Sequence, residues 1–187
     1  RAGELNTLWK EAWANQTQYR NTTQIIPDAE PIITPRFLLI HSLSHAFINQ
    51  LALDAGYGVA SLKERLYVSD LDNVKMAGIL IYTSSSDSEG TLGSLSEKAE
   101  PENFKHTLNQ AIRNQLMCSN DPICLDGITA LTQTFNPAAC HSCLILPETS
   151  CIHFNRFLDR STLTGTSYYK GTKDVFKGFF EEILETD

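Results

Sequence analysis

The sequence predicts a fold of the α+β class, in which helices pack with a mixed sheet that has a buried central strand. Two apolar stretches, at residues 36–58 and 100–118, have the three-to-four spacing of helices. Between them residues 79–82 read ILIY, and a continuous apolar run of this length is typical of a strand that is covered on both faces. Hydrophobic residues make up 42% of the 187 residues, which is enough apolar surface for a core.

The first 35 residues are predicted to form a helix followed by an extended, proline-containing connector. Trp9 and Trp13 share an apolar stripe of this helix. We therefore divide the chain into residues 1–35 and a main domain at residues 36–187. At the far end, residues 173–187 carry phenylalanines at helical spacing, which predicts a closing helix that packs on the core or on a partner.

The long apolar helix of the main domain has sequence signals at both ends. Thr34 suits the N-cap, Pro35 suits the first helical position and Gly56 suits the stop. His41 and His45 are four residues apart and share one face of the helix. A metal site would need further ligands and none is adjacent, so we interpret the two as a buried pair that hydrogen-bonds to another element.

After a turn into a first strand at residues 61–68, the strand around residues 79–82 leads into a polar, glycine-bearing loop. Loops that follow a central strand often carry functional residues. Asp87 and Glu89 lie in this loop. One alternative function is therefore a metal-dependent hydrolase or nuclease, whose site these two carboxylates would form with the paired histidines of the helix.

Four of the five cysteines, Cys118, Cys124, Cys140 and Cys143, lie in one short segment. They form two pairs that flank one loop, and the second pair is a Cys-x-x-Cys motif, which is typical of a zinc knuckle. A Zn²⁺ ion held by four thiolates has no open position for water, so it stabilises structure rather than performing chemistry. Cys151 is the alternate ligand and could replace Cys118.

Two histidines, His141 and His153, stand close to these cysteines. Because four thiols suffice for one ion, we interpret both as supporting or surface groups. An odd number of clustered cysteines suggests a reducing compartment, and therefore a cytoplasmic location. No apolar run approaches 18 residues, so no membrane span is expected. The net charge of -7 argues against an autonomous nucleic-acid binder, although it allows a few local contacts.

Several phrases resemble those of a known family and occur in the same order: LLIHSLSHAFI, GYGVASLKERLYV, GILIYTSSSDSEGTLGSL, CSNDPIC, ACHSCLILPETSC and NRFLDR. Over residues 36–160 the chain resembles the C-terminal cysteine-rich domain of the DrmB component of DISARM anti-phage systems. It also resembles the zinc-binding domain that closes MrfA-type helicases. The resemblance implies that Cys151 is the dispensable cysteine, because some helicase relatives replace it. No Gly-Lys-Ser/Thr motif is present, so we expect no ATP hydrolysis by this fragment.

The resemblance implies a non-catalytic, zinc-stabilised domain of a helicase-associated defence protein. Such a domain would assist DNA engagement and dock on a helicase-type partner subunit. Arg156 and Arg160 are the first candidates for DNA contact, because NRFLDR would place them on one face if it were helical. Given the acidic balance, we expect the isolated domain to bind DNA weakly.

Further candidates for phosphate contact or base stacking include Lys63, Arg65 and Tyr82. The remaining alternative is a pure protein-interaction module, which would dock through Trp9, Trp13 and the phenylalanine-rich tail. The acidic balance suits this alternative better than direct DNA binding.

Overall fold

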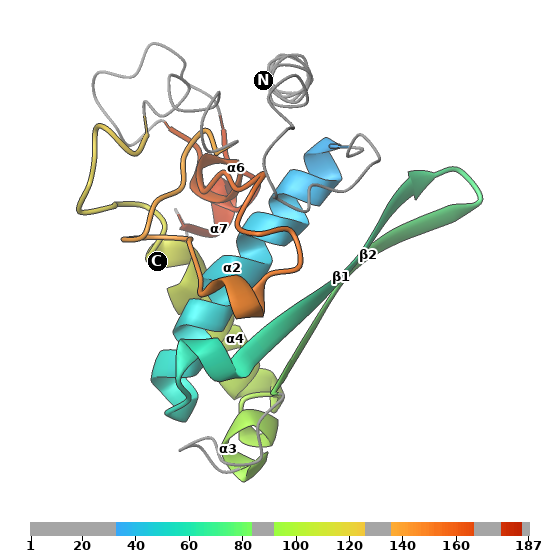
Figure 1. Cartoon of the computed structure of the whole chain (residues 1–187), viewed down its shortest axis with the longest axis vertical. Helices are drawn as coiled ribbons and strands as arrows, with labels where there is room; N and C mark the ends of the chain where they lie inside the picture. Colours follow the sequence, from blue (N-terminus) through green and yellow to red (C-terminus); the bar gives the residue numbers. More distant parts are fainter. Residues whose placement is uncertain (1–32, 84–91, 126–135, 167–176, 185–187) are drawn as a thin grey trace, which may run out of the picture.

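The computed structural model describes residues 33–83, 92–125, 136–166 and 177–184, which form a helical body and one β-hairpin (Figure 1). The main elements are the helices α2 (Pro35–Ala55) and α4 (Pro101–Arg113) and the strands β1 (Leu62–Leu71) and β2 (Val74–Thr83). The shorter elements are η1 (Val59–Ser61), α3 (Leu92–Glu97), η3 (Glu148–Ser150), α6 (Ser161–Thr164) and α7 (Glu181–Leu184). Helices and a sheet together confirm the α+β class. Across the described ranges, no helix combines the length and apolarity that a bilayer crossing requires.

Helix α2 runs through the middle of the molecule and begins and ends where its sequence predicts (Figure 1). The Thr34 hydroxyl accepts a hydrogen bond from the backbone N–H of Phe37 at 3.2 Å, and Pro35 occupies the first turn. Gly56 closes the helix in the left-handed region, at φ 72°, and its N–H donates to the carbonyl of Ala52. Buried residues lie on most sides of α2, so this helix is the scaffold for the rest of the fold.

The two strands pair as an antiparallel hairpin, in register from Leu62 opposite Thr83 to Leu71 opposite Val74. The hairpin projects away from the helices, and its turn lies at the far end (Figure 1). Only its base is fully buried, where Leu62 packs in the core and Glu64 faces α2.

The sheet differs from the predicted mixed sheet with a buried central strand. Among the described residues it has two antiparallel strands. Ile79 and Ile81 are half-buried, whereas Leu80 and Tyr82 are 46% and 40% exposed. The prediction of a buried central strand failed because an apolar run in the sequence does not distinguish a strand that is covered on one face from a strand that is covered on both. One face of β2 packs on the body, and the other faces outward.

The core consists of two hydrophobic clusters on different sides of α2. The segment 144–146, which follows Cys143, separates them. One cluster joins α2 to the base of the hairpin and consists of Ile48, Leu51, Ala52, Ala55, Tyr57, Leu62 and Leu146. The other joins α2 to α4 and α6 and consists of Ala46, Ala111, Leu144, Leu158 and Leu163. Because Leu144 and Leu146 enter opposite clusters, the chain at residues 144–146 is held between them.

Residues 136–166 form mostly irregular structure that packs onto α2. The backbone N–H of Asp159 donates to the Ser42 hydroxyl at 2.9 Å. The Asn155 side chain holds both backbone groups of Leu146, accepting from its N–H at 2.9 Å and donating to its carbonyl at 2.8 Å. These long-range hydrogen bonds satisfy backbone groups that a helix or a sheet would otherwise satisfy.

The segment NRFLDR is not helical, so the condition under which Arg156 and Arg160 would share a face is not met. Phe154, Asn155 and Phe157 have positive φ angles, and α6 begins only after Arg160. Arg160 is 2% exposed, so it does not share a surface with Arg156. Its guanidinium points inward and donates to the carbonyl of Gln115 at 2.8 Å.

Several sequence predictions fall on other parts of the chain. The predicted N-terminal helix with Trp9 and Trp13, and the loop residues Asp87 and Glu89, lie outside the described residues. The division at residue 35 stays a prediction. In the tail, Phe180 packs against the second core cluster, while Phe179 is exposed.

Candidate metal centres

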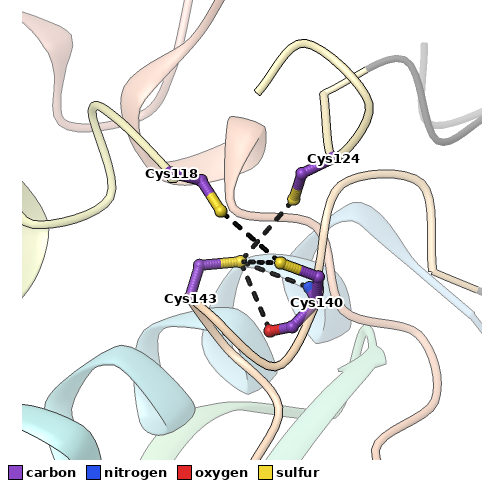
Figure 2. Close-up of side chains that lie close together, drawn as sticks. All are labelled: Cys118, Cys124, Cys140 and Cys143. Atoms are coloured by element: carbon purple, nitrogen blue, oxygen red, sulfur yellow. Dashed lines mark hydrogen bonds between the residues drawn. The ribbon is translucent and has the colours of Figure 1, made fainter. Parts of the chain in front are cut away.

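The four sulfurs of Cys118, Cys124, Cys140 and Cys143 converge on one point (Figure 2). The Sγ–Sγ distances are 3.4 Å for Cys118–Cys140, 3.7 Å for Cys124–Cys143 and 3.8 Å for Cys140–Cys143. A tetrahedron built on Zn–S bonds of about 2.3 Å has edges of about 3.8 Å. All five cysteines are free thiols. This four-cysteine cluster therefore has the spacing of a tetrahedral metal site and not of disulfides.

The Cys-x-x-Cys turn places two of these sulfurs through its own backbone. The N–H groups of Cys143, Leu144 and Ile145 all bond the Cys140 carbonyl, at 3.1, 3.2 and 3.1 Å. The Cys140 N–H points at the Cys143 sulfur, at 3.3 Å. These hydrogen bonds hold the turn in the conformation that places the Cys140 and Cys143 sulfurs 3.8 Å apart.

Cys118 and Cys124 lie in a turn after α4, and the buried side chain of Arg160 stabilises this turn. Asp121 accepts from the backbone N–H of Cys118 at 2.9 Å and forms an ion pair with Arg160. The Arg160 guanidinium also hydrogen-bonds the Cys124 side chain. Four thiolates around one divalent ion leave an excess negative charge. Arg160 therefore supplies positive charge where the cluster needs it.

With no ion bound, the buried thiols of this cluster hold their protons. Burial raises the pKa of Cys118 to about 11. A hydrogen bond with Cys143, together with burial, raises the pKa of Cys124 well above its usual range. A metal ion would displace these protons, because a thiolate is a far better ligand than a thiol.

A second group of potential ligands lies around the two histidines of α2. His41 Nε2 is 3.2 Å from Glu64 Oε1 and 3.3 Å from Cys151 Sγ, and His45 Nε2 is 3.3 Å from the same Glu64 oxygen. All four side chains of this histidine cluster are buried. His45 Nδ1 also lies 2.8 Å from the carbonyl oxygen of Leu144, the residue after Cys143. The two histidines are buried and hydrogen-bond to other elements, as predicted, but the structure also places two further potential ligands, Glu64 and Cys151, beside them.

Burial and hydrogen bonding shift the pKa values of His41 and Glu64. Burial lowers the pKa of His41 from 6.5 to about 4, so this imidazole is neutral at pH 7. Burial alone would raise the pKa of Glu64, but hydrogen bonds with His41 and His45 outweigh it and hold this pKa well below its usual range. A carboxylate ion therefore stands in the protein interior.

The structure brings together all four predicted zinc ligands and keeps the alternate, Cys151, apart from them in the histidine cluster. His141 is exposed, and His153 is half-buried with its ring against that of His41, at 5.2 Å between centroids. Sequence reasoning missed Glu64. Glu64 alternates with Leu62 and Leu66 along the first strand, so the sequence places its carboxylate on the apolar face of that strand. A carboxylate in such a position is unusual and could have identified Glu64 as a candidate.

Two comparisons with known proteins agree with this geometry. The family model described as the MrfA Zn-binding domain matches residues 43–144. A protein named DISARM protein DrmB, from Bacillus paralicheniformis, is 38% identical over 148 residues, which are 79% of this chain. The chain spans 25% of the length of that relative. The family match and the sulfur geometry both indicate Zn²⁺ as the metal. The matched span includes the whole four-cysteine cluster but neither His41 nor Cys151.

Proposed function

Because the chain belongs to the MrfA Zn-binding domain family, we propose that Cys118, Cys124, Cys140 and Cys143 hold one structural Zn²⁺ in a non-catalytic domain of a helicase-associated defence protein. The observation that carries this proposal is the near-tetrahedral spacing of four sulfurs. The similarity to a DISARM protein supports the defence role.

A closed metal site supports the non-catalytic part of the proposal. Four thiolates fill the coordination of zinc, so no position remains for water or substrate. The histidine cluster gives no better route to catalysis, because His41 and His45 are fully buried and no substrate reaches them. The hydrolase alternative would need an open site that includes these side chains.

The zinc assignment is tested by metal content and by cobalt substitution. We expect Cys143→Ser to lose the ion of the four-cysteine cluster and to unfold its surroundings, since structural zinc contributes on the order of 10 kcal/mol in small zinc modules. Cys151→Ser is the matched control and should keep that ion. In Co²⁺-loaded protein, the sulfur-to-cobalt charge-transfer absorption should be strong in the control and collapse in Cys143→Ser. Unchanged absorption in Cys143→Ser would contradict the assignment.

The outer face of the hairpin supports a role in DNA engagement. In the antiparallel register, Lys63 pairs with Tyr82 and Arg65 pairs with Leu80, so these side chains share the face that points away from the body. Arg65 lies over the ring of Tyr67, 6.0 Å from its centroid. Basic groups that alternate with exposed aromatic rings suit phosphate contact with base stacking.

This assignment moves the expected DNA contacts from the arginine pair to the hairpin. Arg160 is committed to Asp121 and to the carbonyl of Gln115, and its burial leaves no surface for a phosphate. Arg156 is half-buried and lies 5.9 Å from the ring centroid of Phe154. Arg156 is therefore at most an accessory contact.

A salt series separates DNA contact from protein docking. We expect Lys63→Ala with Arg65→Ala to weaken DNA binding by the parent complex and to lower the slope of log affinity against log salt by about 2. Lys75→Ala is the control, because Lys75 is also exposed on the hairpin but belongs to the opposite face. An equal effect of the control, or a slope that neither variant changes, would remove the hairpin face from the DNA contact.

An apolar hollow beside the hairpin supports docking of the helicase-type partner. Its volume is about 530 Å³, and it lies between Phe47 of α2, Ile79 and Ile81 of β2, and Phe104 of α4. We assign it to an apolar segment of the partner subunit. Phe104→Glu should abolish co-purification with that subunit at high salt, where apolar contacts persist. Phe179→Glu changes an exposed phenylalanine of the tail. If only the tail variant loses the partner, docking belongs to the tail instead.

A further inference from the structure

We infer that the histidine cluster is a second metal site, in which His41, His45, Glu64 and Cys151 hold one Zn²⁺ ion independently of the four-cysteine cluster. The ligand atoms come from α2, from β1 and from the turn after η3, and all lie within 4.8 Å of one another. Imidazole, carboxylate and thiolate are together the ligand types that zinc accepts.

The distances match those of a coordinated ion. For bond lengths of about 2.0 Å to nitrogen or oxygen and about 2.3 Å to sulfur, a tetrahedron has edges of about 3.3 Å between N and O and about 3.5 Å between N and S. The two N–O distances are 3.2 and 3.3 Å, and the N–S distance is 3.3 Å. The histidine cluster thus has the same near-tetrahedral spacing that identifies the four-cysteine cluster.

Hydrogen bonding around His45 orients its ring as in a zinc-bound histidine. The carbonyl of Leu144 can only accept, so His45 carries a proton on Nδ1, and Nε2 is the ring nitrogen left to bind a metal ion. Nε2 faces Glu64 Oε1 at 3.3 Å, and both atoms are ligand types that zinc accepts. Donation of the second ring N–H to a backbone carbonyl is also the usual support of a zinc-bound histidine.

An unpartnered oxygen of Glu64 points to the same conclusion. Among the residues that the structure describes, Glu64 Oε2 is buried with no hydrogen-bond partner. A buried carboxylate with one oxygen unpaired is costly in an apolar interior. Zn²⁺ bound by one carboxylate, one thiolate and two neutral imidazoles forms a group with no net charge. Such a group can be buried at far lower cost than the carboxylate alone.

The rival account is a buried ion pair between Glu64 and a protonated His45. It also explains short N–O distances, but it assigns no role to the Cys151 sulfur, which the backbone N–H of Asn155 approaches at 3.4 Å. An ion pair needs two groups, whereas the histidine cluster brings four potential ligand atoms within 4.8 Å of one another. The two accounts differ in the number of ions that each protein molecule carries.

The decisive measurement is the metal stoichiometry and ligand shell of the unmodified full chain. We expect two zinc ions per chain by native mass spectrometry. X-ray absorption at the zinc edge should show five sulfurs and three nitrogen or oxygen ligands shared by the two ions. One zinc per chain with four sulfur ligands would overturn the inference and leave the four-cysteine assignment intact.

Variants show which site each ion occupies. Glu64→Gln and Cys151→Ser should each retain one ion and the full thiolate-to-cobalt absorption of the four-cysteine cluster. Cys143→Ser should instead retain the ion of the histidine cluster, with little of that absorption. Glu102→Gln and His141→Ala, both at exposed positions, are the controls and should keep two ions. Two ions in Glu64→Gln and in Cys151→Ser alike would place the second ion elsewhere and reject the histidine cluster as its site.

Discussion

At the scale of single residues, the molecule relies on a few buried charges that each serve more than one neighbour. Arg160 connects Asp121, the carbonyl of Gln115 and the side chain of Cys124. A cation in this position holds the turn that carries one cysteine pair and offsets the charge of the thiolates. Its planar guanidinium serves these separate acceptors at once, which the single ammonium of a lysine does not.

We expect Arg160→Met to lower the free energy of unfolding by roughly 3 kcal/mol, because it leaves the half-buried carboxylate of Asp121 without its ion-pair partner. Chemical denaturation of the zinc-loaded protein measures this change. Arg65→Met removes an exposed arginine and should change stability by less than about 0.5 kcal/mol. Equal stabilities of the two variants would show that the buried ion pair has no net structural role.

At the scale of elements, α2 is the part of the fold that its sequence predicts most fully. Its start, its stop and its burial on most sides follow from Thr34, Pro35, Gly56 and a dense apolar pattern, all of which are local signals. The four-cysteine cluster was predictable for the same reason, since its ligands are close in sequence and their spacing is diagnostic.

The histidine cluster could not be predicted in this way, because its ligands meet only in the folded chain. His45 and Glu64 are 19 residues apart, and His41 and Cys151 are 110 apart. The exposed face of β2 was missed because apolar strand residues read alike whether one face or both are covered. The turns at residues 154–157 depend on positive φ angles at Phe and Asn, which no local preference of phenylalanine indicates.

The N-cap of α2 gives a direct test at this scale. Thr34→Ala removes the hydroxyl that accepts from the Phe37 N–H and should cost about 1 kcal/mol of stability. Thr149→Ala, at an exposed position in η3, should cost far less. Thermal unfolding of the two proteins at equal zinc concentration measures the difference, and a larger loss in Thr149→Ala would contradict the capping role.

At the scale of the whole molecule, we expect metal to stabilise the body and the base of the hairpin more than the outer part of the hairpin. The segments 118–125 and 136–146 contain little regular structure and are joined through the four sulfurs. The outer part of the hairpin is held by the pairing of β1 with β2.

Removal of zinc with a strong chelator under reducing conditions should therefore increase amide hydrogen exchange in 118–125 and 136–146. Exchange at the paired positions between Leu66 and Ile79 should change much less. Mass-spectrometric exchange on intact and chelated protein resolves these segments. A uniform increase along the chain would indicate that metal holds the hairpin as well.

The packing of residues 136–166 on α2 also has a consequence for the order in which the chain folds. The hairpin closes contacts that are near in sequence, whereas Ser42 meets Asp159 across 117 residues. Local pairings form early and distant ones late, since each distant contact must first close a long loop. The helix and hairpin are therefore expected to assemble before the C-terminal segment docks. On this route the thiols of Cys140 and Cys143 stay accessible until the last step, so the cell must keep them reduced and supply metal during that interval.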